Sequence, residues 1–328
     1  MHGVPMSSAR EARGFEVLEN PLDSPHFATF QASESDQLIF EIGTAIKLGR
    51  VALVQGVGPD AADRIIGKVA DRFGILDSLE IQSGFAGIQG HRENIGRYLT
   101  TVNRRPDYGF LCSHSEGQRN MVVQIACFYC YENTTDGGVT ILQSTDPNSS
   151  EWSLLREVTI KLDLCGRTLS RTDVAQARAL FGVILPDDIL SDRDEVLRER
   201  ESPFSGVRFF DTLSPLTKAY SVVSEQHVYV CWENVSAADL DSTKQFMQLL
   251  RNCELLREPV GRDISKLDYS YSRKVFSSGM AYEKLFTSRV IRKLRPQEFI
   301  IFNNMLWTHA ASNWTHSSGI RKLAAVFA

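Results

Sequence analysis

Side chains that bind transition metals lie in two short segments of the chain. The first, "LCSHSEGQ", places His114 and Glu116 two residues apart. Successive side chains of an extended strand point to opposite faces, so these two share a face and lie about 7 Å apart along the strand. At that separation one cation could be shared by an imidazole and a carboxylate. The second segment, "WTHAASNWTHSSGIR", contains Trp-Thr-His twice and offers His309 or His316 as a third ligand.

Two histidines and one carboxylate on one side of a metal form the facial triad of non-haem Fe(II) oxygenases. This triad leaves three coordination positions open, which dioxygen and a chelating co-substrate require. An arginine on a neighbouring strand can grip a distal carboxylate of that co-substrate through two parallel hydrogen bonds. Arg321 closes the second segment, and a Gly137-Gly138 turn feeds a strand that starts at Thr140.

The elements that must position these residues are mostly strands. β-Branched and aromatic runs separated by turn residues predict strands. They are "GRYLTTVN", "MVVQIACFYCYE", "GVTILQST", "HVYVCWENV" and "EFIIFNNMLW". Apolar spacing with capping residues predicts helices at 35–49, 59–74, 172–182 and 238–257. Helices first and many short strands later favour a mainly β sandwich or barrel with flanking helices.

The domain organisation is predicted from the segments that lack apolar periodicity and from the absence of linkers. Residues 1–35 are polar and lack periodicity, which predicts an arm that lies over the surface or is partly disordered. Residues 36–328 contain no linker and are expected to form a single domain. Within it, 183–221 is charged and irregular, and a long loop inside a compact domain is often a functional lid. We therefore expect 183–221 to be a lid insertion.

The composition restricts the function classes. The 328 residues carry a net charge of −4, so no overall basic field attracts nucleic acid or anionic lipid. No signal peptide and no apolar run of membrane-spanning length is present, which predicts a soluble cytoplasmic protein. Six cysteines spread over such a chain are expected to be reduced. Cys127 and Cys130 would point to opposite faces of their strand, as buried structural thiols.

The order of these motifs resembles a known family. His-x-Glu, then Gly-Gly-x-Thr, then Pro, an apolar strand, Asn, His and Arg is similar to the iron(II)/2-oxoglutarate dioxygenases of the taurine dioxygenase and clavaminate synthase group. The resemblance covers roughly 95–146 and 290–328. It implies a double-stranded β-helix, or jelly-roll, core. Glutamate as the carboxylate ligand resembles the clavaminate synthase and amino-acid hydroxylase branch.

The resemblance also assigns the residues of the site. His114 and Glu116 would be the first two Fe(II) ligands. His309 lies twelve residues before Arg321 and directly follows an apolar strand, as the third ligand does in the family, whereas His316 lies only five before it. The resemblance therefore favours His309 as a ligand and makes His316 a loop residue.

The same resemblance implies the co-substrate and the reaction. Thr140 would donate a hydrogen bond to 2-oxoglutarate, and Arg321 would bind its C5 carboxylate. With O2, the expected reaction is hydroxylation of an amino acid or an amino-acid-derived metabolite, in natural-product biosynthesis. Desaturation or cyclisation would use the same cofactor machinery. A zinc hydrolase with the same three ligands and a metal-free jelly-roll binding module are the other classes left open.

Three positions depart from the family pattern. The usual Pro-Gly-Asp turn is replaced by Pro296-Gln297-Glu298, and the usual Asp-Asn is replaced by Asn303-Asn304. Both departures concern turns. The arginine often found two residues after the last histidine is replaced by Ala311, which removes a substrate contact. Substrate binding in this chain is therefore expected to differ from that of the best-known members.

Overall fold

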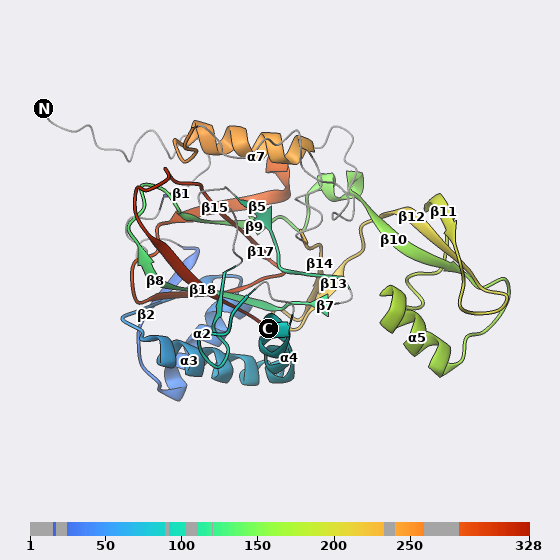
Figure 1. Ribbon diagram of the computed structural model, residues 1–328, viewed down its shortest axis with the longest axis horizontal. Coiled ribbons are helices and arrows are strands. Elements are labelled where there is room, and N and C mark those ends of the chain that lie inside the picture. Colours follow the sequence, from blue (N-terminus) through green and yellow to red (C-terminus); the bar gives the residue numbers. More distant parts are fainter. Residues whose placement is uncertain are drawn as a thin grey trace, which may run out of the picture.

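The computed structural model describes residues 16–17, 25–88, 92–102, 111–119, 121–232, 240–258 and 282–328. Two large sheets, flanking helices and one projecting unit make up this part of the chain (Figure 1). The prediction of a mainly β protein with flanking helices is confirmed at this level. No helix among the described residues is both long and apolar enough to cross a membrane.

The larger sheet has six strands. In spatial order it consists of β2 (Phe27–Gln31), β3 (Val51–Gln55), β16 (Glu298–Asn303), β8 (Ile125–Asn133), β18 (Arg321–Phe327) and β4 (Thr100–Thr101). All neighbouring strands are antiparallel except β2 and β3, which run parallel. Segments that lie far apart in the sequence therefore meet in one layer.

The smaller sheet has five strands and contains both histidine segments. Its spatial order is β1 (Glu16–Val17), β15 (Phe286–Arg292), β9 (Thr140–Thr145), β17 (Trp307–Ala311) and β5 (Leu111–His114). Strand β17 pairs with β9 on one side and with β5 on the other, antiparallel in both cases. The short strand β1 comes from the predicted arm and runs parallel to β15.

The alternation of side chains along the strands shows that the two sheets face each other. In β8, Ala126 and Phe128 join one apolar cluster, whereas Ile125 and Cys127 join another. The first cluster also receives side chains from the five-stranded sheet, such as Trp307 of β17. This cluster is therefore the interior of a two-sheet sandwich. Cys127 and Cys130 are buried free thiols on opposite faces of β8, as predicted.

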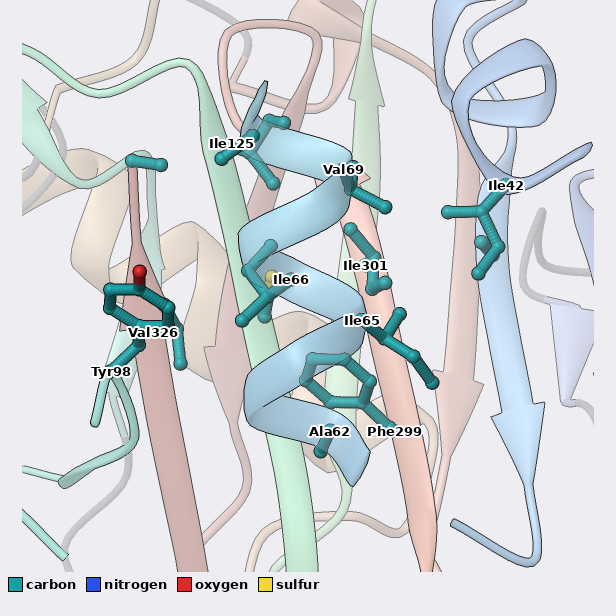
Figure 2. Close-up of a cluster of buried hydrophobic side chains, with 14 of the residues drawn as sticks. Ile42, Ala62, Ile65, Ile66, Val69, Tyr98, Ile125, Phe299, Ile301 and Val326 are labelled. Carbon is teal, nitrogen blue, oxygen red and sulfur yellow. The ribbon is translucent and has the colours of Figure 1, made fainter. Parts of the chain in front are cut away.

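Helices cover both outer faces of the sandwich. Helix α2 (Asp36–Lys47) begins after Ser35, whose hydroxyl accepts the Leu38 N–H, and α3 (Pro59–Arg72) begins with a proline. Figure 2 shows α3 over the six-stranded sheet, with Ile65 on the side of the helix where Phe299 and Ile301 of β16 lie. Helix α7 (Leu240–Asn252) lies over the five-stranded sheet (Figure 1). These layers bury the strands that carry both histidine segments.

The prediction that 183–221 is irregular is wrong. It contains two strands, β11 (Glu195–Arg200) and β12 (Arg208–Pro215), which pair with each other, and β12 also pairs with β10 (Arg156–Asp163). With α5 (Arg171–Phe181) they form a unit that projects from the sandwich (Figure 1). This projecting unit has its own apolar cluster, which includes Phe209. Its role as a lid remains a prediction.

A buried ion cluster anchors the projecting unit to the sandwich. β6 (Gly117–Gln118) and β7 (Met121–Val122) form a short hairpin directly after Glu116. Arg119 in the turn of this hairpin pairs with the buried carboxylate of Asp188, which also accepts a hydrogen bond from Lys161 Nζ at 3.1 Å. The base of the projecting unit therefore contacts the segment that follows Glu116.

Several smaller predictions also change. Residues 27–31 of the predicted arm form β2 inside the six-stranded sheet, while 1–15 and 18–24 lie outside the described residues. Helix α4 (Leu76–Ile88) was not predicted, since its apolar residues do not form one stripe. The strand expected over 227–235 is reduced to β14 (Gln226–Val228), which pairs with β13 (Ala219–Ser221); residues 233–239 lie outside the described part.

Candidate metal centre

Strand register brings the two histidines together. His114 and His309 are direct partners in the antiparallel pair of β5 and β17. On β17, His309 shares the inner face with Trp307, while Thr308 points to the opposite face and contacts the Ser113 hydroxyl. Both imidazoles are almost fully buried, with 2% and 4% exposure. Their ring centroids lie 4.4 Å apart.

Glu116 completes a group of three metal-binding side chains. Its Oε1 lies 3.7 Å from His114 Nε2 and 3.5 Å from His309 Nε2. One ligand atom from each of the three residues lies within 4.8 Å of the others. Both Nε2 atoms therefore converge on the same carboxylate oxygen. We call His114, Glu116 and His309 the triad.

Asn304 fixes the backbone of Glu116. Its side-chain oxygen accepts the Glu116 N–H at 2.9 Å, and its Nδ2 donates to the Glu116 and Val123 carbonyl oxygens at 2.9 and 2.8 Å. Asn304 is fully buried in the turn between β16 and β17. One amide thus holds the segment after β5 against the turn that precedes His309. Sequence reasoning treated Asn304 only as part of a turn and missed this role.

The protonation states of the triad suit a cation. Burial raises the pKa of Glu116, but hydrogen bonds from His114 and His309 outweigh it, so the pKa lies well below 4.5. Burial, together with the repulsion from His114, lowers the pKa of His309 to about 4. At neutral pH, His309 is a neutral imidazole beside a carboxylate. Metal ligands need this state.

Arg92 and an aromatic wall border the triad. Arg92 Nη2 lies 3.4 Å from Glu116 Oε1, and its guanidinium lies over the Phe327 ring at 4.4 Å from the centroid. Phe327 packs edge-on against Phe128, whose ring centroid lies 4.9 Å from that of His309. The triad therefore has an apolar side and one added positive charge. Nothing in the local sequence indicated Arg92.

Thr140 and Arg321 share the inner surface of the sandwich with the triad. Thr140 is the Cα partner of Ala311 on β17, two residues beyond His309. On β9 it alternates in phase with Leu142, which belongs to the cluster between the sheets. Arg321 begins β18 in phase with Leu323 of the same cluster. The structure thus places both residues on the faces that line the sandwich interior.

Arg321 is a half-buried cation with no carboxylate partner among the described residues. Its Nε donates to the Gly138 carbonyl at 3.1 Å, and its guanidinium lies 5.6 Å from the Trp314 ring centroid. Burial lowers the pKa of Arg321 to about 10, yet the group stays charged at neutral pH. No carboxylate of the described residues forms an ion pair with it. A cation that is partly withdrawn from water is a suitable binding partner for an anion.

The Gly137-Gly138 pair is a crossing between the two sheets and not the simple hairpin turn that it resembles in the sequence. It connects β8 of the six-stranded sheet to β9 of the five-stranded sheet. A Cβ on Gly138, which has φ +63°, would lie 2.7 Å from Arg321 Cδ, and one on Gly137 would lie 2.1 Å from the Asn313 carbonyl oxygen. Glycine is needed here because the loop contacts the 313–321 segment directly.

His316 lies outside the triad. Its side chain is exposed in the turn before β18, with Nδ1 2.8 Å from the Ser317 hydroxyl. His227 is likewise exposed on β14, beside Tyr220. His91 lies outside the described residues. Of the two histidines in the Trp-Thr-His repeats, the structure therefore brings His309 to His114 and Glu116.

The donor set and its surroundings define what the site can hold. Two imidazole nitrogens and one carboxylate oxygen suit Fe(II), Mn(II), Co(II) or Zn(II). Three protein ligands do not complete an octahedral shell, so positions remain for exogenous ligands. The half-buried guanidinium of Arg321 could bind an anion on the same interior surface. The arrangement can therefore bind a metal together with an anionic ligand.

Comparisons with known proteins give only weak structural likenesses. No family model matches the chain, and no curated protein matches its sequence. Among solved structures, AAD-2 in complex with Mn(II) and N-oxalylglycine is similar, with 9% identity and a TM-score of 0.39, over 93% of this chain and 94% of that one. A protein from Burkholderia xenovorans, proposed to be an alpha-ketoglutarate dependent 2,4-D dioxygenase, has 11% identity and a TM-score of 0.36, over 92% of both chains.

Proposed function

We propose that this protein is an Fe(II)/2-oxoglutarate-dependent oxygenase with a double-stranded β-helix core. The triad would hold Fe(II), and Arg321 and Thr140 would bind 2-oxoglutarate. The observation that carries the proposal is the half-buried guanidinium of Arg321, which no described carboxylate neutralises. It lies on the same interior surface as a three-ligand metal group, as a chelating dicarboxylate requires.

The residues of the chain have separate tasks in this proposal. Bound Fe(II) with 2-oxoglutarate and O2 supplies the oxidising power for an unactivated C–H bond. Arg321 binds the distal carboxylate, Thr140 donates a hydrogen bond to it, and Asn304 keeps the Glu116 carboxylate in place. Phe128 and Phe327 exclude water from one side of the triad.

The reaction outcome and the substrate are part of the same proposal. Hydroxylation of an amino acid or amino-acid-derived metabolite, in natural-product biosynthesis, is the expected reaction. Desaturation or cyclisation would follow from another substrate pose. Halogenation is disfavoured because Glu116 takes the coordination position that a halide needs.

An anaerobic titration tests the proposal. Purified protein with Fe(II) should develop a weak visible charge-transfer band on addition of 2-oxoglutarate. His309→Ala should abolish both iron binding and the band, because it removes an inner-sphere ligand. The matched control His316→Ala changes an exposed imidazole in a neighbouring Trp-Thr-His and should retain both. Loss of the band in His316→Ala and not in His309→Ala would show that the ligands are misassigned.

A zinc hydrolase is the second candidate, because two histidines and a glutamate are also the ligands of a catalytic zinc site. Zinc-loaded protein would then hydrolyse a substrate without 2-oxoglutarate, and Arg321→Gln would leave that turnover unchanged. Elemental analysis of purified protein separates both candidates from a binding module that uses no metal.

A further inference from the structure

A buried network of hydrogen bonds lies directly behind Arg321. The Gly138 carbonyl oxygen accepts a hydrogen bond from Arg321 Nε at 3.1 Å and another from Asn133 Nδ2 at 3.0 Å. The Thr135 hydroxyl lies 2.9 Å from Asn133 Oδ1 and 3.0 Å from the Gly137 carbonyl oxygen, and its proton serves these two acceptors. Asn133 is 8% exposed and Thr135 is 1% exposed. The network therefore fixes the carbonyl group that holds Arg321 Nε.

A bulge in β8 turns Asn133 toward Arg321. Cys130 faces the interior of the sandwich and Tyr131 packs on the opposite side, so simple alternation would turn residue 133 away from the interior. The pairing of β8 with β18 skips Tyr131, however, and Asn133 is the Cα partner of Arg321. Opposed residues of an antiparallel pair lie on the same face. The bulge therefore re-aims Asn133 and places its amide beside the guanidinium.

The network leaves the end of the Arg321 guanidinium for a ligand. With Nε bound to the Gly138 carbonyl, Nη1 and Nη2 are the remaining donors, and neither has a hydrogen-bond partner in the part of the chain that the structure describes. Neither atom is fully buried. The loop also restricts the arginine from behind, since a Cβ on Gly138 would lie 2.7 Å from Arg321 Cδ. A carboxylate would therefore bind Nη1 and Nη2 end-on, at a position that the network determines.

We propose that Asn133 and Thr135 are positioning residues for Arg321 and that they set the length of the co-substrate. This rests on the proposed function, in which a 2-oxo acid chelates the metal at one end and binds Arg321 at the other. A fixed metal and a fixed guanidinium accept only one spacing between the two ends of the acid. The longer acid 2-oxoadipate, which has one more methylene than 2-oxoglutarate, should then bind poorly. Binding sites discriminate one methylene by about 10- to 200-fold.

Titration of Co(II)-loaded protein with the two acids, without oxygen, is the test. The visible bands of Co(II) report the ligands around the metal, so each titration gives a Kd without turnover. We expect the wild type to bind 2-oxoglutarate about tenfold or more tightly than 2-oxoadipate. Thr135→Val replaces the hydroxyl with a methyl group of similar shape, and Asn133→Leu removes the amide. Both should lower the preference to about threefold or less, whereas Thr135→Ser keeps the hydroxyl and should retain it.

Thr145→Val is the matched control. Thr145 is also buried, and its hydroxyl also donates to a backbone carbonyl, that of Leu306 at 3.0 Å, but it lies at the other end of β9 from Thr140. The control should keep the full preference for 2-oxoglutarate, although urea denaturation should show a loss of stability similar to that of Thr135→Val. All variants should bind Co(II) as the wild type does, because the triad is unchanged.

Three results would overturn the roles of Asn133 and Thr135. They are a wild type that binds the two acids equally or prefers the longer one, a Thr135→Val or Asn133→Leu protein that keeps the full preference, and a Thr145→Val protein that loses it. The proposed function fails differently: in that case 2-oxoglutarate does not change the Co(II) spectrum of the wild type at all. If 2-oxoglutarate changes the spectrum and one of the three results is found, only the positioning roles fail.

Discussion

At the scale of single residues, the site depends on ionisable groups that have been removed from water. His309 is buried and Arg321 is half-buried, and burial lowers the pKa of each. The consequences differ because His309 becomes neutral at physiological pH while Arg321 keeps its charge. A neutral imidazole can bind a metal, and a charged guanidinium can bind a carboxylate.

Acid should destabilise the metal-free protein through His309. The ring binds a proton with a pKa of about 4 in the folded state and about 6.5 in the unfolded chain, so acid favours unfolding. Stability should be lost as pH falls from 6.5 toward 4, by on the order of 3 kcal/mol. Glu116 acts in the same direction, because its stabilising charge is lost below its own lowered pKa.

Urea denaturation of the metal-free protein at several pH values measures this loss. His309→Gln, which cannot titrate, should flatten the dependence between pH 6.5 and 4. His316→Gln should leave the dependence unchanged, because that ring is exposed. A His309→Gln curve as steep as that of the wild type would mean that other groups account for the acid sensitivity.

Arg321→Gln should raise the KM for 2-oxoglutarate strongly and leave metal affinity nearly unchanged. Hydrogen bonds to charged groups contribute about 1.5–3 kcal/mol each, so the loss corresponds to roughly tenfold or more. Lys322→Gln is the control, because Lys322 is the exposed neighbour of Arg321 and lies over the Tyr131 ring. Steady-state succinate formation measures both. An unchanged KM in Arg321→Gln would assign the co-substrate to another cation.

At the scale of elements, the sequence predicted the strands that bury one face and expose the other. Alternation predicted that Cys127 and Cys130 would face opposite sides, and they do. The single strand predicted over "EFIIFNNMLW" is wrong, because this run forms β16, a turn and the start of β17, which belong to different sheets. The sequence did not predict β11, whose residues are almost all exposed. That strand is ordered by pairing with β12 and by Arg198 and Arg200, which bind Asp211, so no burial pattern marks it.

The supporting residues of the site were beyond local prediction for a related reason. Asn304 contacts Glu116 across 188 residues of sequence, and Arg92 reaches it from a segment with no regular pattern. Residue types and spacing can suggest ligands, because ligands need particular atoms. They cannot suggest which amide or guanidinium the fold will bring beside them.

The turn before β16 shows how one departure from the family pattern lowers the stability of the fold. Gln297 has φ +64°, in the left-handed region where glycine has no Cβ penalty. Gln297→Gly should therefore raise the unfolding free energy by about 0.5–1 kcal/mol. This value is the backbone strain that glycine relieves, minus the conformational entropy that glycine loses on folding. Gln37→Gly in the exposed face of α2 should lower it by about 1 kcal/mol. Thermal unfolding distinguishes the two signs.

At the scale of the whole molecule, the projecting unit is joined to the sandwich by charge. Asp188 is buried between Arg119 and Lys161, and Arg119 follows Glu116 by three residues. Removing the buried carboxylate takes this partner from Lys161 and leaves Arg119 with the exposed Asp187, 4.0 Å away, which is costly in a place that excludes water. This ion cluster therefore holds the projecting unit on the sandwich and also fixes the position of the segment after Glu116.

Asp188→Asn should lower stability by about 3–5 kcal/mol and speed proteolytic cleavage within 183–221. Its affinity for Mn(II), measured by calorimetry, should also fall, because the hairpin after Glu116 loses its anchor. Asp187→Asn changes an adjacent carboxylate that is 63% exposed, and it should behave like the wild type. Cleavage and Mn(II) affinity unchanged in Asp188→Asn would show that the projecting unit is held by other contacts.

The direct pairing of His114 with His309 also determines which changes of chain length the protein can tolerate. Deletion or insertion of one residue within β17 or β5 would exchange the inner and outer faces, bringing Thr308 or Ser113 inward in place of an imidazole. The same change in the loop between β11 and β12 would leave the triad intact. In a library of single-residue insertions and deletions, metal retention should therefore map the two ligand strands as intolerant and the projecting unit as permissive.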